Sequence, residues 1–271
     1  MKQLNLADIK QLQMNILDDV HEFCLKNNIR YSLAGGTLLG ALRHKGYIPW
    51  DDDIDIVMPQ PDYEKFLFTY RPSKSYYKLD YNDINKDFLL PWAKIYDTRT
   101  STKGRNYIDD RMIFIDIFPL NAVPAEKTKE FIEETRAILD KIKKVGKYYK
   151  YTSNPKEKII MFLKYCVKIS KIKGTANIKK LFDKYYKILS EYNYNDSKLV
   201  GLMGGNYGIR EVWPKEIFED YKIVDFEDRK YQIIKDAEKY LEITYGNWQR
   251  IPPENERMIP HVSNAFIQYI D

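Results

Sequence analysis

The spacing of apolar residues predicts helices and strands in alternation in the N-terminal half of the chain. Apolar side chains recur at three- and four-residue intervals from Leu6 to Asn27, which predicts an amphipathic helix that ends at Asn27-Asn28. Apolar runs between turn residues then predict strands at 30–34, up to Val57, at 92–96 and at 112–118, with helices at 37–43 and 61–70.

The pattern becomes helical after Pro124 and mixed again towards the C-terminus. The predicted helices are 126–147, 155–170 and 175–191, followed by a hairpin of 221–226 and 230–234 and a helix capped by Asp236 that ends near Gly246. The mixture of predicted helices and strands favours an α+β fold, and 271 residues with 44% hydrophobic content are enough for one core with an inserted helical subdomain. We predict a core at 1–124, a helical basic subdomain at 125–195 and a part at 196–271 that completes the core.

Carboxylates alternate with isoleucines along one predicted strand. Alternation places Asp53 and Asp55 on one face and points Ile54 and Ile56 into the core. Two carboxylates on one face repel each other, and a divalent cation relieves that conflict. Mg²⁺ in particular uses one or two carboxylates together with substrate phosphates. The pattern therefore predicts metal-dependent phosphoryl chemistry; Asp51 is in alternation with the pair and could join it.

A further acid, Asp116, stands on a predicted strand, on the same face as Phe114 and Phe118. A carboxylate among apolar residues is costly to bury without a partner. We predict that Asp116 binds the same metal as Asp53 and Asp55; the alternative is a structural hydrogen bond or salt bridge. A calcium loop is excluded by residues that do not fit its glycine and bidentate glutamate positions, Ile56 and Asp62.

A glycine pair, Gly35-Gly36, precedes Thr37, a plausible N-cap. Exposed N–H groups at such a helix start attract phosphate, although an ordinary strand-to-helix turn would have the same sequence. Further candidates for phosphate or substrate contact are Arg43, Lys45, Trp50 and Lys94, with His44 as an acid–base group. Their alternatives are a basic helix C-terminus for 43–45 and a core position for Trp50.

The cysteines and the apolar segments of the chain indicate the cellular compartment in which the protein is expected. Cys24 and Cys166, with three His, form neither a disulfide framework nor a zinc pattern, which fits a reducing cytoplasm. The N-terminus lacks a signal-peptide core, and the longest apolar run, 159–163, is too short to span a bilayer. We expect a cytoplasmic protein, with possible peripheral contact at the inner face of the cell membrane.

Thirteen lysines and a single acid lie between Lys141 and Lys180, in a chain of formal net charge +5. A basic amphipathic stretch of this kind can bind an anionic membrane surface or a polyanionic glycan. A solvated helix face is the alternative. Nucleic-acid binding is not expected, because no reader motif accompanies the charge.

The block LAGGTLLGALRHKGYIPWDDDIDIVM, from Leu33 to Met58, closely resembles the LicD family, which includes the fukutin-like proteins of the nucleotidyltransferase-fold superfamily. MGGNYG at 203–208 and YGNWQRIPP at 245–253 resemble later blocks of the family. The resemblance implies a nucleotidyltransferase-like mixed β-sheet flanked by helices, with Asp53, Asp55 and Asp116 as catalytic and metal-binding acids.

The resemblance also implies a reaction. A protein of this family would use Mg²⁺ or Mn²⁺ to move a phospho-alcohol, most plausibly phosphocholine from CDP-choline, onto a hydroxyl of a cell-surface glycan such as teichoic acid, capsular polymer or lipopolysaccharide. CMP would be the leaving group, and the acceptor would be lipid-linked. The alternatives are a nucleotidyltransferase that attaches NMP to a sugar or protein, and a non-catalytic glycan- or membrane-binding protein.

Overall fold

The computed structural model describes residues 2–83, 88–102, 112–149, 178–257 and 265–267. Its helices are α1 (Leu6–Asn27), α2 (Gly35–His44), α3 (Gln60–Thr69), α4 (Thr128–Tyr149), α6 (Ile178–Ser190) and α7 (Ala237–Tyr245). Its strands are β1 (Lys2–Gln3), β2 (Ser32–Leu33), β3 (Asp55–Pro59), β4 (Tyr77–Asp80), β5 (Ala93–Asp97), β6 (Thr100–Thr102), β7 (Ile113–Val123), β8 (Leu199–Gly201), β9 (Val212–Pro214), β10 (Tyr221–Phe226), β11 (Arg229–Ile234) and β12 (Ala265–Ile267).

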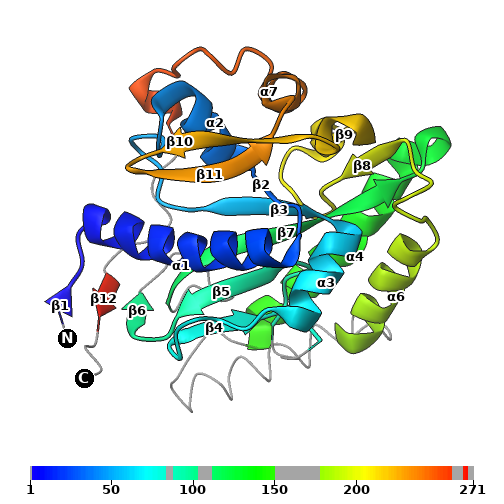
Figure 1. Cartoon of the computed structure of the whole chain (residues 1–271). Helices are drawn as coiled ribbons and strands as arrows, with labels where there is room; N and C mark the ends of the chain where they lie inside the picture. Colours follow the sequence, from blue (N-terminus) through cyan, green and yellow to red (C-terminus); the bar gives the residue numbers. More distant parts are fainter. Residues whose placement is uncertain (1, 84–87, 103–111, 150–177, 258–264, 268–271) are drawn as a thin grey trace.

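A mixed sheet forms the centre of the molecule (Figure 1). Its strands run in the order β2-β3-β7-β5-β4, with β3 parallel to β7 and the other neighbours antiparallel; β8 pairs with β7, and β9 with β8. The predicted α+β class is therefore confirmed. A separate hairpin of β10 and β11 packs against β2, and β12 lies between β1 and β6.

Helices α1 and α3 pack on one face of the sheet (Figure 1). The main core lies under them, where Ile54, Ile56, Ile115 and Ile117 are fully buried against the helices, as alternation predicted. Helix α1 starts with a capping box between Asn5 and Asp8. It also buries Cys24, and burial raises the pKa of that thiol, which supports its structural role. Cys166 lies outside the described residues.

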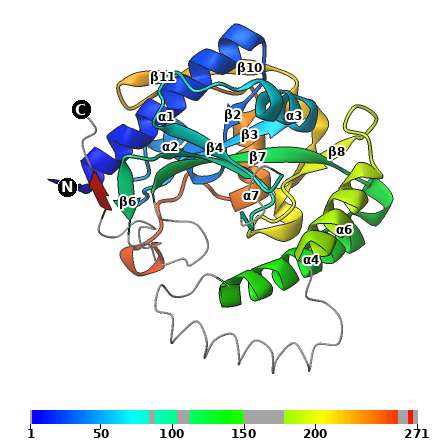
Figure 2. The ribbon, with the colours of Figure 1, turned by 90° about the horizontal axis from the view of Figure 1, so that it is seen from below.

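The helical middle of the chain has its own small core. Helices α4 and α6 lie side by side (Figure 2). They bury Phe131, Ile142, Phe182 and Tyr185 together with Met203 from the next segment. The predicted helix 155–170 and most of the lysine-rich stretch lie outside the described residues.

Two predicted helix starts differ from the structure. Helix α2 begins at Gly35, with Ala34 as its N-cap, so Thr37 is not the cap; its hydroxyl instead accepts a hydrogen bond from the backbone N–H of Asp55 (2.9 Å). Asp236 is at the N-cap of α7 but makes no capping hydrogen bond with its side chain. For Thr37, a tertiary contact with the strand that carries the acids decides the role of the side chain.

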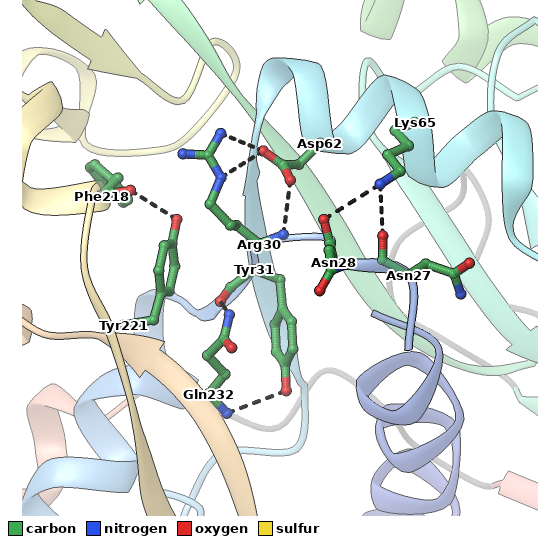
Figure 3. Close-up of polar contacts among 9 residues, drawn as sticks. All are labelled: Asn27, Asn28, Arg30, Tyr31, Asp62, Lys65, Phe218, Tyr221 and Gln232. Carbon is green, nitrogen blue, oxygen red and sulfur yellow. Dashed lines mark hydrogen bonds and ion pairs between the residues drawn. The ribbon is translucent and has the colours of Figure 1, made fainter. Parts of the chain in front are cut away.

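Polar contacts join segments that are far apart in the sequence around Arg30 (Figure 3). The Arg30 guanidinium donates to Asp62 Oδ2 (2.9 and 2.6 Å), and its backbone N–H donates to Asp62 Oδ1 (2.9 Å). Gln232 of β11 donates to the backbone oxygen of Tyr31 (2.8 Å). These bonds hold α3 and the β10–β11 hairpin against the entry to β2, and so set the frame for β3.

We expect Asp62→Ala to lower the free energy of unfolding by about 1–2 kcal/mol, because three N–H donors of Arg30 lose the carboxylate that they share. The loss is limited because the half-exposed Arg30 side chain can then hydrogen-bond to water. Urea unfolding measures this loss. Lys65→Ala is the control from the same helix, and should change stability by less than about 0.5 kcal/mol because its ammonium is exposed. Equal losses in the two variants would contradict the assignment.

Candidate functional site

Three charged residues form a row across adjacent strands. Asp55 of β3 lies in register with Asp116 of β7, and Asp116 lies in register with Lys94 of β5. The predicted pairing of Asp55 and Asp116 on one face of the sheet therefore has a structural basis: parallel pairing of β3 with β7 places the two carboxylates side by side. The opposite face carries the isoleucines beneath α1 and α3.

Asp116 has a partner for each of its carboxylate oxygens. Lys94 Nζ lies 3.1 Å from Oδ1 and 3.2 Å from Oδ2, and the indole N–H of Trp92 donates to Oδ1 at 2.5 Å. The Lys94 ammonium also lies 3.2 Å from the Phe114 ring centroid, in a cation–π contact. Both members of the ion pair are buried. The salt-bridge alternative for Asp116 is thus present, and metal coordination by Asp116 stays a prediction.

The acids upstream form a repelling group. β3 begins at Asp55 rather than before Asp53, yet burial still alternates: Asp51, Asp53 and Asp55 are half-buried, while Asp52 is fully buried. Burial raises the pKa of Asp53 and of Asp55. The carboxylates of Asp55 and Asp51 raise the pKa of Asp53 further, and the carboxylate of Asp116 does the same for Asp55. Asp53 also shares a side-chain hydrogen bond with Asp51, which brings Asp51 into the group.

The first turn of α2 packs directly against these carboxylates. Gly35 has φ +53°, and a Cβ there would lie 3.1 Å from Asp55 Oδ2; a Cβ on Gly36 would lie 2.7 Å from Asp51 Oδ2. Glycine is therefore required for close approach as well as for backbone conformation. The helix start presents N–H groups and a positive dipole end beside the acids, which is the arrangement that binds phosphate.

Three of the predicted residues, Arg43, His44 and Lys45, lie at the C-terminal end of α2, about 12–15 Å from Gly35 along the helix axis. Arg43 donates to the backbone oxygens of Trp248 (2.7 Å) and Arg250 (3.0 Å), so it holds the C-terminal segment. His44 Nε2 accepts from Arg43 Nε (2.9 Å), and burial together with Arg43 lowers the pKa of His44. Lys45 is the exposed C-cap of α2 in the left-handed conformation (φ 61°).

Trp50 belongs to this second group. Its ring meets the His44 ring edge to face at 6.2 Å, and the Arg257 guanidinium lies 4.3 Å from its centroid. The described structure thus gathers Gly35, Gly36, Thr37, Lys94 and the acids 53, 55 and 116 at one place, and gives Arg43, His44, Lys45 and Trp50 structural contacts elsewhere.

Sequence reasoning missed residues that lie in the two later blocks or within a few positions of them. Tyr240 Oη accepts a hydrogen bond from the Gly35 N–H (3.2 Å), and Tyr245 Oη lies 3.8 Å from the position of a Cβ on Gly35. Tyr207 packs on Tyr245, and the Glu211 carboxylate accepts from the Tyr207 N–H (2.7 Å). The blocks at 203–208 and 245–253 were visible in the sequence, but their distance from the acids along the chain hid their location.

Trp92 is a further residue that was missed, although its alternation with Lys94 was a usable signal. Beyond Asp116, its indole lines a cavity of about 260 Å³ between α3, α6 and the connection from β4 to β5. Tyr63, Tyr81, Asp83 and Tyr186 also line this cavity. The indole therefore forms a wall shared by the cavity and the acid site.

The donor set of the acid site fits a hard divalent cation. Asp53 and Asp55 offer only carboxylate oxygens, which Mg²⁺ prefers, and each raises the electrostatic cost of ionising its neighbours. Within the described residues no group of three His, Cys, Asp or Glu side chains is arranged to hold a metal. Two carboxylates with substrate phosphates suffice for Mg²⁺, so the pair Asp53 and Asp55 remains compatible with such a site.

No helix in the described part of the chain combines the length and the apolar character needed to cross a lipid bilayer.

A family model and a relative similar over nearly the whole chain indicate the same family. The family model described as LicD/FKTN/FKRP, nucleotidyltransferase domain, matches residues 28–160. A lipopolysaccharide cholinephosphotransferase, LicD, of Haemophilus influenzae is 31% identical over 278 positions, which cover 98% of this chain and 100% of the relative. Uncharacterized proteins of Rickettsia typhi and Rickettsia prowazekii are each 45% identical over 62 residues, 22% of this chain and 20% and 23% of theirs. This chain belongs to the LicD family, as its first block predicted, and is a LicD-like phosphotransferase.

Proposed function

We propose that this enzyme transfers phosphocholine from CDP-choline to a hydroxyl of a cell-surface glycan and releases CMP. The relative from Haemophilus influenzae, similar over nearly the whole of both chains, is a lipopolysaccharide cholinephosphotransferase. The acceptor proposed here is accordingly a lipopolysaccharide or another lipid-linked glycan, such as a teichoic acid or capsular polymer.

One observation carries the proposal: the glycine turn of α2 and the acids of β3 and β7 meet at one place. Asp55 and Asp116 are in register, and the first turn of α2 lies against Asp55 and Asp51. A diphosphate at this helix start would receive backbone N–H groups and the positive end of the helix dipole. The same position brings its phosphorus atoms beside the carboxylates.

Asp53 and Asp55 are the residues that would hold a Mg²⁺ or Mn²⁺ ion, with Asp116 as a third acid at its edge. A bound ion would neutralise charge on the diphosphate during transfer. The raised pKa values of Asp53 and Asp55 support this assignment, because a cation removes the repulsion that raises them.

Asp116 is the residue proposed to take the proton of the acceptor hydroxyl. The acceptor oxygen then bonds to the phosphorus distal to the cytidine, the bond from that phosphorus to the bridging oxygen breaks, and CMP leaves with the electron pair. Lys94 and Trp92 hold the Asp116 carboxylate in position through its two oxygens. A base must be within hydrogen-bond reach of the proton that it removes, and this support preserves that geometry.

The lysine-rich segment is proposed to meet the lipid-linked acceptor or the anionic membrane surface. Its described portion includes Lys141 and Lys144, which are exposed on α4, and Lys179 and Lys180, which are exposed on α6. Exposed lysines attract anionic lipid headgroups with a strength that decreases with salt. Nucleic acid is not proposed as a partner.

CMP release and thermal stability test the donor directly. With Mg²⁺, we expect CDP-choline at one hundred times its dissociation constant to stabilise the protein by about 2.7 kcal/mol, or about 5–10 °C. CDP-ethanolamine, CDP-ribitol and CDP-glycerol should shift it less, and EDTA should remove the shift and the CMP release. Release of pyrophosphate from a nucleoside triphosphate, without CMP from any CDP compound, would replace the proposal with nucleotidyl transfer.

A further inference from the structure

Two tyrosine rings form an aromatic corner at the edge of the acid site. Tyr207 precedes a 3₁₀ turn (Gly208–Glu211), and Tyr245 is the last residue of α7. Their centroids are 5.3 Å apart and their planes meet at 81°, so the edge of one ring faces the other. Both residues are half-buried, so neither is sealed in the core. Their role in the reaction is not explained by the steps described above.

The corner lies within a short distance of the carboxylates. Tyr245 Oη and Asp55 Oδ2 are both within 4 Å of one point, the position that a Cβ on Gly35 would take (3.8 and 3.1 Å). Tyr240, five residues earlier on α7, accepts a hydrogen bond from the Gly35 N–H and so anchors α7 on the start of α2. A group bonded to a phosphate at this helix start therefore reaches the corner through a short linker.

A buried carboxylate shapes the loop that carries Tyr207. Glu211 accepts a hydrogen bond from the Tyr207 N–H at 2.7 Å, and the N–H groups of Asn206 and Gly208 also point to it. A Cβ on Gly205 would lie 2.2 Å from both oxygens of this carboxylate, so the loop wraps closely around it. Glu211 thus positions the loop that carries the Tyr207 ring; burial raises the pKa of this carboxyl, and the three N–H groups oppose that rise.

The charges that face the corner are mostly negative. Burial raises the pKa of both phenols. Glu211 and Asp51 raise the pKa of Tyr207 further, and Asp55 and Glu211 raise that of Tyr245. A cation also faces it, the exposed Arg210, whose guanidinium carbon is 5.2 Å from the Tyr207 ring centroid. The carboxylates near the corner outnumber the cation on the Tyr207 ring, and this balance favours a cationic ligand over an anionic one.

We propose that Tyr207 and Tyr245 bind the quaternary ammonium group of the donor, with Glu211 as a positioning residue; this inference rests on the proposed function. A trimethylammonium group has no hydrogen-bond donor, so ring faces and nearby negative charge are what recognise it. Its two-carbon linker to the phosphate matches the short separation between the corner and Asp55.

The test compares two donors on the full chain with Mg²⁺. Calorimetry gives the dissociation constants of CDP-choline and CDP-glycerol, and their ratio measures recognition of the cationic head. We expect Tyr207→Leu and Tyr245→Leu each to reduce this preference about five- to tenfold, because the ring face is lost. Tyr207→Phe and Tyr245→Phe should retain most of it. Tyr192→Leu is the matched control, a half-buried tyrosine in a similar edge contact (5.4 Å to Phe131) that lies in the helical core.

The outcomes separate this inference from the proposed function. If the unmodified chain releases CMP from CDP-choline and both Leu variants keep the wild-type preference, the corner is not the ammonium site, although the proposed function stands. If the unmodified chain uses no CDP-choline, both fail. The unmodified chain also gives a second test, which does not depend on the folding of any variant. CDP-choline should bind more tightly than CDP-ethanolamine, because the unmethylated ammonium of ethanolamine is more strongly hydrated. Equal affinities would overturn the proposal.

Discussion

Asp55→Asn is expected to reduce CMP release at least about 10²–10³-fold while it raises the melting temperature of the metal-free protein. The activity loss follows because one charged oxygen ligand next to the diphosphate is removed. The gain in stability follows because Asp55 is partly buried beside Asp53 and Asp116, and the amide ends that repulsion without a change in shape. An inactive variant that is more stable distinguishes loss of chemistry from loss of fold.

The same repulsion predicts a pH dependence for the metal-free protein. Burial and neighbouring carboxylates raise the pKa of Asp53 and Asp55 above the ordinary value of 3.8. The folded state therefore binds more protons than the unfolded state above about pH 4, and the contribution of these groups to stability falls as pH rises towards their folded-state pKa values. Thermal unfolding in EDTA between pH 5 and pH 7 should show a steeper fall for the wild type than for Asp55→Asn.

Two conditions check the origin of the effect. Saturating Mg²⁺ should reduce the difference in slope, because a cation compensates the carboxylates. Asp225→Asn, an exposed acid of the β10–β11 hairpin, should change neither activity nor slope. A melting temperature for Asp55→Asn below that of the wild type in EDTA would show that Asp55 is a stabilising partner rather than a strained ligand.

Lys94→Met is expected to lower the free energy of unfolding by about 3–5 kcal/mol, which is the typical cost of leaving one charge of a buried ion pair uncompensated. Lys94 and Asp116 are both buried, with 5% and 11% of their side chains exposed, and the ammonium also loses its contact with the Phe114 ring. Chemical denaturation in EDTA measures this loss without help from a metal at Asp116.

The double variant Lys94→Met/Asp116→Asn provides the control for that prediction. Removal of the second charge should recover most of the lost stability, because neither buried charge then lacks a partner. A stability of Lys94→Met equal to that of the double variant would mean that Asp116 does not depend on Lys94. The double variant should release no CMP, because Asp116 is the proposed base.

The sequence was sufficient wherever local periodicity decides structure. The amphipathic repeat and capping residues define α1, and the β10–β11 hairpin forms where alternation and the intervening turn predicted it. The alternation of acids and isoleucines assigned Asp55 and Asp116 to the polar face of the sheet, because the side-chain period of a strand does not depend on its neighbours. The family block also identified the glycine turn beside these acids.

The sequence could not decide which contacts side chains make across distant segments. Arg43, His44, Lys45 and Trp50 are close to the acids along the chain. The first three nevertheless lie at the opposite end of α2 from the glycine turn, and the C-terminal segment contacts Arg43 and Trp50. In contrast, Trp92 reaches Asp116 only through the pairing of β5 with β7.

The sequence by itself determined the class of the fold, the polar face of the central strands and the family, because these depend on short-range periodicity and on one contiguous block. Only the tertiary structure decided which residues from distant segments lie beside the acids. It brought Tyr245 to Gly35, and Tyr207 and Glu211 to Tyr245, across about 170 to 210 positions of the chain, through the packing of α7 on α2 and of the 208–211 turn on α7. Packing of this kind depends on the summed burial of many residues, which no local pattern records.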